Sequence, residues 1–103
     1  MLNQIVLVGR LVQDPEIKEL ENGMRTSYIT LAVSRSYKNA NGEYDTDLIP
    51  VTLFKGIAEN TKEYCKKGDL LGIKGKIECE NGKINLIAER ISFLSSRKEK
   101  EEE

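Results

Sequence analysis

Apolar and polar residues alternate along two central segments of the chain, with the period of a β-strand that buries one face. Residues 27–34 read SYITLAVS and residues 48–54 read LIPVTLF. In the second segment the odd-numbered residues form an apolar core face. The outward face ends in Phe54, one of only two phenylalanines in the chain. Such scarce aromatic surface on the outside of a strand is a first indication of a binding surface.

Residues 3–11 differ from these strands because their IVLVG run is apolar on both faces. A strand that is buried on both faces needs cover on both sides. One side can be the core of the domain, and the other is most simply covered by a partner subunit. Cover by this chain's own helix is the alternative. The predicted subunit interface comprises Asn3, Ile5, Val6, Leu7 and Val8.

Two further strands are predicted over residues 69–80 and 83–94, joined by a tight Asn81-Gly82 turn. The inward row of the first comprises Leu71, Ile73, Ile77 and Cys79. Gly75 lies in the same row and indicates a sharp bend. The inward row of the second shifts from Ile84, Leu86 and Ala88 to Ile91 and Phe93. We therefore expect a β-bulge near Glu89 and Arg90.

The remaining elements are one helix, one short strand and a polar hairpin end. A helix is expected over residues 57–67, which carry an apolar stripe at helical spacing and precede Gly68, a natural C-terminal cap. Residues 16–20 predict a short strand, and residues 35–47 a long polar hairpin end. This order of elements predicts an all-β protein with one helix. The expected architecture is an OB-fold, a five-stranded Greek-key barrel with the helix between its third and fourth strands.

Composition narrows the function. The chain has 103 residues, a net charge of −1 and no histidine. The lack of histidine removes His-based acid–base and nucleophilic catalysis and nearly every catalytic zinc site. We therefore expect no enzyme, no metal and no cofactor. Both cysteines, Cys65 and Cys79, are expected to be buried apolar side chains. No secretory signal or membrane span is visible, so the expected location is the cytoplasm.

The domain is expected to end at residue 94. Residues 95–103 read SSRKEKEEE and have nothing to bury, which predicts a charged, disordered tail. Residues 1–94 then form the single OB domain.

Basic and aromatic residues gather at the ends of the second and third barrel strands, where OB barrels bind their ligands. The candidates are Arg35, Tyr37, Lys38, Phe54 and Lys55, with Lys74 and Lys76 on the fourth strand. Aromatic rings interleaved with cations are typical of single-stranded nucleic-acid binding. Each residue also has a plainer interpretation. Phe54 could pack under a loop or subunit, Tyr37 could simply be exposed, and the lysines could form a solvated face.

Two other tyrosines bear on the same predicted surface. Tyr44 could stack on a base but is a weaker candidate, and Tyr28 is expected to pack against other protein. The combined placement of rings and cations is the signal, rather than any single residue.

Three stretches resemble the bacterial-type single-stranded DNA-binding protein family. They are NQIVLVGRLVQDPEI at 3–17, ITLAVSRSYKNANGE at 29–43 and DLIPVTLFKGIAENTKEYCKKGDLLGIKGKI at 47–77. The resemblance implies an OB-fold that assembles as a homotetramer, a dimer of dimers, in which first strands pair. It also implies binding of single-stranded DNA in replication, recombination and repair, without catalysis or a cofactor.

The resemblance carries over to individual positions unevenly. Tyr37 and Phe54 match stacking aromatics, and Lys18 and Lys76 match basic positions. Leu48 stands where the family commonly has Trp or Phe. The hairpin around Asn81 is short, and Glu78 stands where the family frequently has a basic residue. The acidic-hydrophobic C-terminal tip that recruits repair proteins is not seen in KEKEEE, so docking of replication or repair proteins through such a tip is not assumed.

These departures leave a rival function open. The chain could be an OB-fold interaction module of the replication machinery, in which DNA binding is weak and a protein partner dominates. The nearly neutral net charge of −1, the missing C-terminal tip and the missing aromatic at Leu48 favour that alternative.

Overall fold

The computed structural model describes residues 1–96. Its elements are β1 (Ile5–Leu11), β2 (Lys18–Glu19), β3 (Arg25–Lys38), β4 (Tyr44–Phe54), α1 (Lys55–Tyr64), β5 (Leu70–Glu80) and β6 (Lys83–Ser95). The predicted tail begins at residue 95, but β6 includes Ser95, and residues 97–103 lie outside the described residues.

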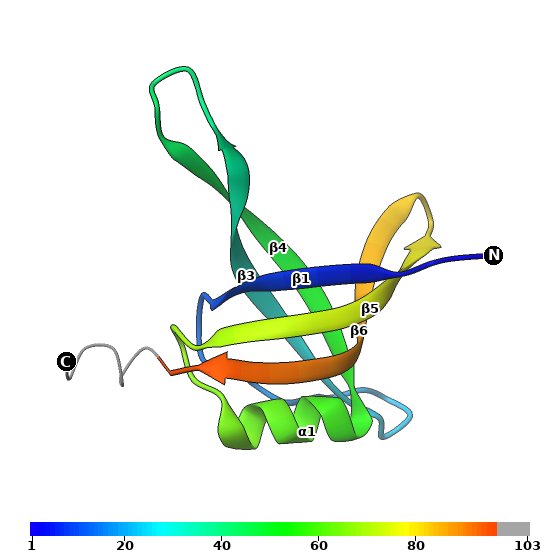
Figure 1. Cartoon of the computed structure of the whole chain (residues 1–103). Helices are drawn as coiled ribbons and strands as arrows, with labels where there is room; N and C mark the ends of the chain where they lie inside the picture. The colour runs from blue at the N-terminus through cyan, green and yellow to red at the C-terminus, as the bar shows by residue number, and fades with distance from the viewer. Residues whose placement is uncertain (97–103) are drawn as a thin grey trace.

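The sheet closes into a barrel. Its strand order is β1-β5-β6-β4-β3-β2, and an additional pairing of β1 with β3, through Arg10–Ala32 and Leu11–Leu31, closes the sheet. The barrel strands are therefore β1, β3, β4, β5 and β6, and the two-residue β2 lies beside β3. Helix α1, between β4 and β5, covers the lower end of the barrel (Figure 1). The predicted OB-fold is confirmed.

One apolar cluster fills the barrel. It comprises Leu11, Ile29, Leu31, Val51, Leu53, Ala58, Cys65, Leu71, Ile73 and Ala88. The core face expected on residues 48–54 is confirmed, because Val51 and Leu53 are buried and Ile49 packs against the cluster.

Four residues predicted to face inward are instead exposed: Ile77, Cys79, Ile84 and Phe93. The prediction was wrong for the first three because the β5–β6 hairpin continues past the barrel as a two-stranded arm, which no second layer covers (Figure 1). The alternation of residue types continues along this arm, but it has no core to face. Phe93 is only half exposed, at a groove beside α1.

The predicted bulge in β6 is confirmed. Lys74 pairs with Arg90 and Gly75 pairs with Ala88, so that Glu89 has no partner in β5. Gly75 is needed at this bend, because a Cβ atom there would lie 2.1 Å from the carbonyl oxygen of Ile87. The bend turns β5 away from β1 and allows the barrel to close.

Helix α1 begins two residues earlier and ends three residues earlier than the pattern predicts. Cys65 has extended backbone angles, φ −119° and ψ 151°, and ends the helix. The next turn is held by Asp69, whose carboxylate accepts a 2.8 Å hydrogen bond from the backbone N–H of Lys66. This local side-chain bond competes with the helical continuation. Ala58 and Thr61 are the buried residues of the helix.

Residues 35–47 are more regular than the predicted polar hairpin end. β3 and β4 continue beyond the barrel as a second two-stranded arm, called here the ribbon, which comprises residues 35–47 (Figure 1). Lys38 pairs with Tyr44 near its tip, and the register shifts between Ser34 and Lys38. The turn is closed by hydrogen bonds of Asn39 with the backbones of Asn41 and Glu43.

Within residues 1–96, no helix has the length and apolar character of a membrane span. The same residues contain no group of three or more Cys, Asp or Glu side chains placed to hold a metal ion.

Candidate nucleic-acid interface

Two rows of directly paired residues cross the strands of one side of the barrel, and together they define the outer wall. The first row runs Lys18–Thr26–Phe54 across β2, β3 and β4, and Thr26 within it is fully buried. The second runs Tyr28–Thr52–Ile87–Lys76 across β3, β4, β6 and β5. Directly paired residues point to the same face of a sheet. The closed barrel thus brings three predicted site residues, Lys18, Phe54 and Lys76, to one surface.

Phe54 lies at the edge of this wall and is half-buried. It ends β4 in an extended conformation, and Lys55 then adopts a positive φ of 52° as α1 begins. This change of direction ends the strand at the surface and leaves part of the Phe54 ring open. Lys55 is exposed beside Arg25 and Glu59 in a shallow hollow near the start of α1.

The outward row of β4 continues from Phe54 into the ribbon through the even-numbered residues to Tyr44. Lys38, opposite Tyr44, places its Nζ 5.8 Å from the centroid of the Tyr44 ring. A cation over an aromatic face is a favourable contact at this distance. Tyr37 is exposed nearby. The ribbon therefore carries two exposed rings and a lysine beyond the barrel.

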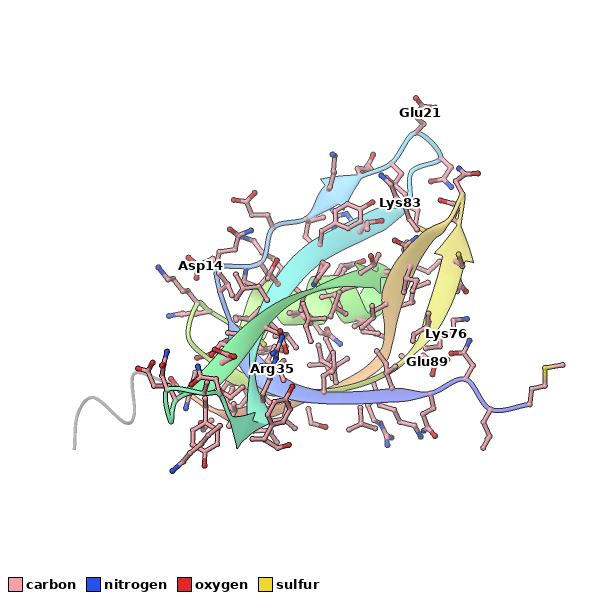
Figure 2. All side chains as sticks on the ribbon, turned by 90° about the horizontal axis from the view of Figure 1, so that it is seen from above. Asp14, Glu21, Arg35, Lys76, Lys83 and Glu89 are labelled. Carbon is pink, nitrogen blue, oxygen red and sulfur yellow. The ribbon has the colours of Figure 1, made fainter. Side chains whose placement is uncertain are left out.

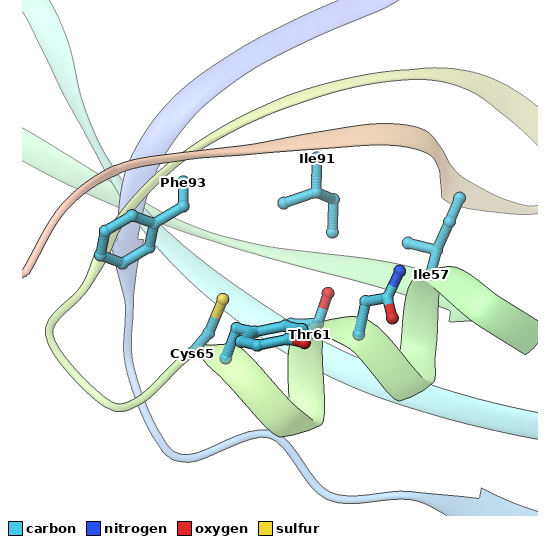
Figure 3. Close-up of a pocket in the computed structure, with 7 residues that line it drawn as sticks. Ile57, Thr61, Cys65, Ile91 and Phe93 are labelled. Atoms are coloured by element: carbon cyan, nitrogen blue, oxygen red, sulfur yellow. The ribbon is translucent and has the colours of Figure 1, made fainter.

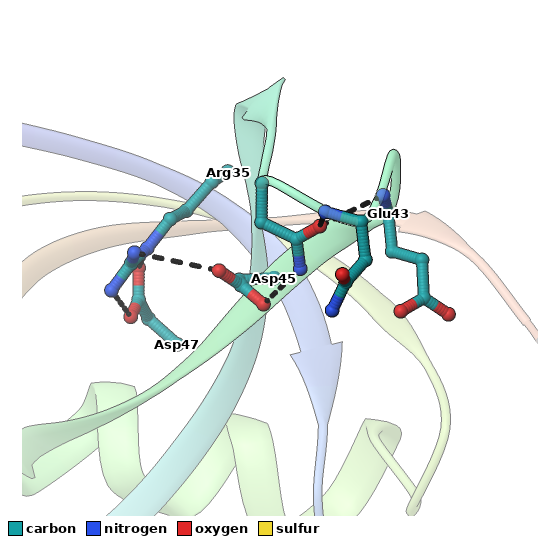
Figure 4. Close-up of polar contacts among 6 residues, drawn as sticks. Arg35, Glu43, Asp45 and Asp47 are labelled. Atoms are coloured by element: carbon teal, nitrogen blue, oxygen red, sulfur yellow. Dashed lines mark hydrogen bonds and ion pairs between the residues drawn. The ribbon is translucent and has the colours of Figure 1, made fainter.

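Arg35 is held by acids on the other face of the ribbon (Figure 4). Its Nε and Nη2 donate hydrogen bonds of 3.0 and 2.9 Å to the two carboxylate oxygens of Asp47, and Nη1 lies 3.8 Å from Oδ2 of Asp45. The bond to Asp47 raises the pKa of Arg35, and Arg35 lowers the pKa of Asp47. One cation beside two carboxylates gives this cluster a net negative charge, so the structure does not bring Arg35 to the outer wall as a free cation.

Lys74 and Lys76 are separated by the bend at Gly75. Lys74 lies in the row Val6–Lys74–Arg90 across β1, β5 and β6. Lys76 belongs to the outer wall and forms a 3.2 Å ion pair with Glu78. Figure 2 labels Lys76 on β5 and Glu89 on β6. Of the two lysines grouped by the sequence, only Lys76 therefore shares a surface with Phe54.

The residues predicted for the subunit interface divide by face. Val6 and Val8 are 70% and 51% exposed, and they border an apolar hollow with Leu94. Ile5 and Leu7 alternate with them and are partly buried, and Leu7 packs against the core cluster. The Asn3 side chain pairs with the backbone of Ile77 through hydrogen bonds of 2.7 and 2.9 Å, which extends the β1–β5 ladder.

Two exposed aromatics that are weaker candidates from the sequence alone share the outward face. Tyr28 is 55% exposed in the second row of the outer wall, and Tyr44 is exposed on the ribbon. The alternation of residues 27–34 already placed Tyr28 outward. The register with β4, which puts it next to the row of Phe54, was not readable from the sequence.

A separate groove lies between α1 and β6 (Figure 3). It has a volume of about 270 Å³ and is lined by Ile57, Asn60, Thr61, Tyr64, Cys65, Ile91 and Phe93. None of these side chains is a lysine or arginine, so this groove does not offer the cations that a phosphate backbone requires. Burial of Cys65 in its floor raises the pKa of that thiol.

Comparison with known proteins shows the family of this chain. Residues 2–93 match the model of the single-strand binding protein family. Single-stranded DNA-binding protein B of Bacillus subtilis (strain 168) is 47% identical over 78 residues, which cover 76% of this chain and 69% of that protein. Single-stranded DNA-binding protein 2 of Staphylococcus aureus (strain Mu50 / ATCC 700699) is 40% identical, over 94% of this chain and 75% of that protein. The chain belongs to the single-strand binding protein family.

Proposed function

We propose that this protein binds single-stranded DNA with little regard to sequence, in the cytoplasm, and protects it during replication, recombination and repair. Bases stack on aromatic rings of the outer wall and the ribbon, and lysines attract the phosphates. Stacking is tolerant of sequence because every base has a π-face. The protein binds and releases its ligand without catalysis.

The outer wall is the observation that carries this proposal. It places the Phe54 ring in line with Lys18 across three strands, and Lys76 one row away. Tyr37, Lys38 and Lys55 extend the surface at the two ends of β4. Arg35 and Lys74 contribute less in this proposal, because Arg35 is paired with Asp47 and Lys74 lies in the row of Val6.

A titration with fluorescently labelled oligo(dT) at several salt concentrations tests the proposal. We expect saturable binding whose log affinity falls linearly with log salt, with a slope of about −0.7 per phosphate neutralised. Oligo(dC) should bind with the same salt slope, and a duplex of equal length should bind far more weakly. Undetectable binding to both oligonucleotides at low salt would overturn the proposal.

The proposal includes assembly as a homotetramer, a dimer of dimers. Within the described residues, β1 pairs with β5 along Ile5–Arg10 and with β3 only at its end, so its other edge has no strand partner over residues 5–9. An unpaired edge is a template for a second strand. The exposed Val6, Val8 and Leu94 beside it supply apolar surface for burial.

Light scattering tests the assembly. We expect a mass about four times the 11.7 kDa of the chain. Val8→Asp should lower the mass by placing a charge in the contact, and Ile84→Asp, on the exposed β5–β6 arm, is the matched control. A wild-type protein that remains monomeric would contradict this part of the proposal while leaving DNA binding open.

The same titration distinguishes the proposed function from its rival, an interaction module with weak DNA binding. A dissociation constant in the range of non-specific contacts, near 10⁻⁴–10⁻⁶ M, together with an unchanged affinity on removal of the Phe54 ring, would favour the rival.

A further inference from the structure

Tyr28 stands on the outer wall, where the described part of the chain leaves more than half of its side chain exposed. Its side chain is 55% exposed, and its partner in β4 is Thr52. On β3 the same-face neighbours two residues away are Thr26 and Thr30. Because all three neighbours are small, a large flat group can approach the ring without displacing another large side chain.

The position of Tyr28 relative to Phe54 is fixed by the β3–β4 register. Phe54 pairs with Thr26, and Tyr28 is two residues further along β3. Diagonal neighbours of this kind lie about 7–8 Å apart and are within reach of aromatic side chains. Two rings at this separation on one face of a sheet can serve two nearby bases of one extended strand.

Each row that carries a ring also ends in a lysine. Lys18 ends the row of Phe54, and Lys76, which is ion-paired with Glu78, ends the row of Tyr28 on β5 at the opposite side of the wall. A single-stranded DNA whose bases lie on the two rings therefore meets Lys18 in the row of Phe54 and Lys76 in the row of Tyr28. A plain exposed tyrosine, such as Tyr64 on α1, has no such arrangement of ring and rows around it.

We infer that Tyr28 is a second base-stacking platform of the outer wall and takes a base close to the one on Phe54. This inference rests on the proposed binding of single-stranded DNA and adds a residue to that same site. It also provides aromatic surface on a wall where Leu48 presents an aliphatic side chain. The ring, rather than the hydroxyl group, is the part that acts.

The test compares three variants with the wild-type protein in oligo(dT) binding at one salt concentration. Tyr28→Thr removes the ring and keeps a β-branched residue suited to the strand. Tyr28→Phe keeps the ring and removes the hydroxyl. Tyr64→Ala is the matched control, because Tyr64 is a tyrosine of similar exposure, 69%, on the helix beside the separate groove.

We expect Tyr28→Thr to raise the Kd about 5- to 150-fold, the usual range for loss of one stacked base. Tyr28→Phe and Tyr64→Ala should stay within about twofold of wild type. If Tyr28→Thr binds as tightly as wild type, or if Tyr28→Phe loses as much affinity as Tyr28→Thr, the inference is wrong although the protein binds DNA. If the wild-type protein does not bind, the proposed function itself fails, and this outcome is distinct.

Intrinsic fluorescence gives a second measurement that does not depend on Tyr28→Thr folding well. The chain has four tyrosines and no tryptophan, so its emission comes from tyrosine. Stacking of a base on Tyr28 should quench part of that emission when oligo(dT) saturates the protein. In Tyr28→Phe the absolute loss of emission on saturation should be smaller than in wild type. An equal loss would count against stacking at this position.

Discussion

Arg35 and Asp47 face each other across the ribbon as a two-point pair. The Nε and Nη2 groups of Arg35 donate to Oδ2 and Oδ1 of Asp47 over 3.0 and 2.9 Å. The fork of the guanidinium matches the two carboxylate oxygens, which is the strongest form of such a bond. The pair holds the two strands together where the ribbon leaves the barrel, and it also neutralises Arg35, one of the cations that the sequence offers for phosphate binding.

Asp47→Asn is therefore expected to strengthen DNA binding. The change removes one negative charge and replaces the two-point ion pair by at most one hydrogen bond to a neutral amide oxygen, while the 3.8 Å contact of Arg35 with Asp45 remains. We expect a lower Kd for oligo(dT) and a salt slope steeper by up to about 0.7, the value for one phosphate neutralised. Salt titrations of wild type and variant measure both quantities.

Glu63→Gln is the control for that change in charge. It removes one negative charge from an exposed position on α1, at the end of the barrel opposite the ribbon (Figure 1). If Glu63→Gln strengthens binding as much as Asp47→Asn, the effect comes from net charge and not from the freed guanidinium.

The same pair predicts how Asp47 titrates. The hydrogen bond from Arg35 lowers the pKa of Asp47 in the folded protein below its ordinary value. Its contribution to stability is thus present above the ordinary pKa of about 3.9 and is lost as the pH falls through the lower folded value. Carboxyl ¹³C shifts followed by NMR should show the low midpoint, and Arg35→Gln should move it up. An unmoved midpoint would show that the pair does not persist in solution.

Phe54→Leu tests the ring that anchors the outer wall. Leucine keeps apolar bulk but offers no aromatic face, so we expect a loss of about 1–3 kcal/mol in binding free energy to oligo(dT). The only other phenylalanine, Phe93, lies at the groove beside α1 and provides the same substitution elsewhere. Phe93→Leu should bind as wild type does, and equal losses in the two variants would argue against a stacking role for Phe54.

Substitution of two different glycines by alanine should change the free energy of unfolding in opposite directions. Gly75→Ala would press a Cβ atom against the backbone oxygen of Ile87, and we expect destabilisation of about 1–3 kcal/mol. Gly56→Ala, on α1, meets no atom within 4 Å and should stabilise by up to about 1 kcal/mol. Urea midpoints at one fixed protein concentration measure both. A neutral Gly75→Ala would mean that the bend at this residue can relax.

The two cysteines should differ in reactivity. Cys79 is exposed on the β5–β6 arm, whereas Cys65 is buried and its thiol pKa is raised first by loss of solvent and then by Asp69. Because the thiolate is the reactive form, one cysteine per chain should react quickly with a thiol reagent at neutral pH. Mass spectrometry should identify it as Cys79, with Cys65 reacting only on unfolding. Rapid reaction of Cys65 in the native protein would contradict its placement.

The sequence alone predicted those features that depend only on residues near one another in the chain. The order of strands and helix, the Asn81-Gly82 turn and the bulge at Glu89 all follow from periods and turn residues within short windows. Phe54 could be placed outward from the alternation of its own strand. The alternation wrongly predicted that Ile84 and Cys79 face inward. Their strands continue past the barrel, so the residue types still alternate but no core lies against them.

Only the tertiary structure decided which side chains share a surface. The register of β3 with β4 puts Tyr28 beside the row of Phe54. The bend at Gly75 separates Lys74 from Lys76, although Gly75 is the one residue between them in the chain. It also placed Arg35 against Asp47, twelve residues away. Alternation fixes which way a side chain points along one strand, whereas a binding surface is set by pairing between strands, which joins residues distant in sequence.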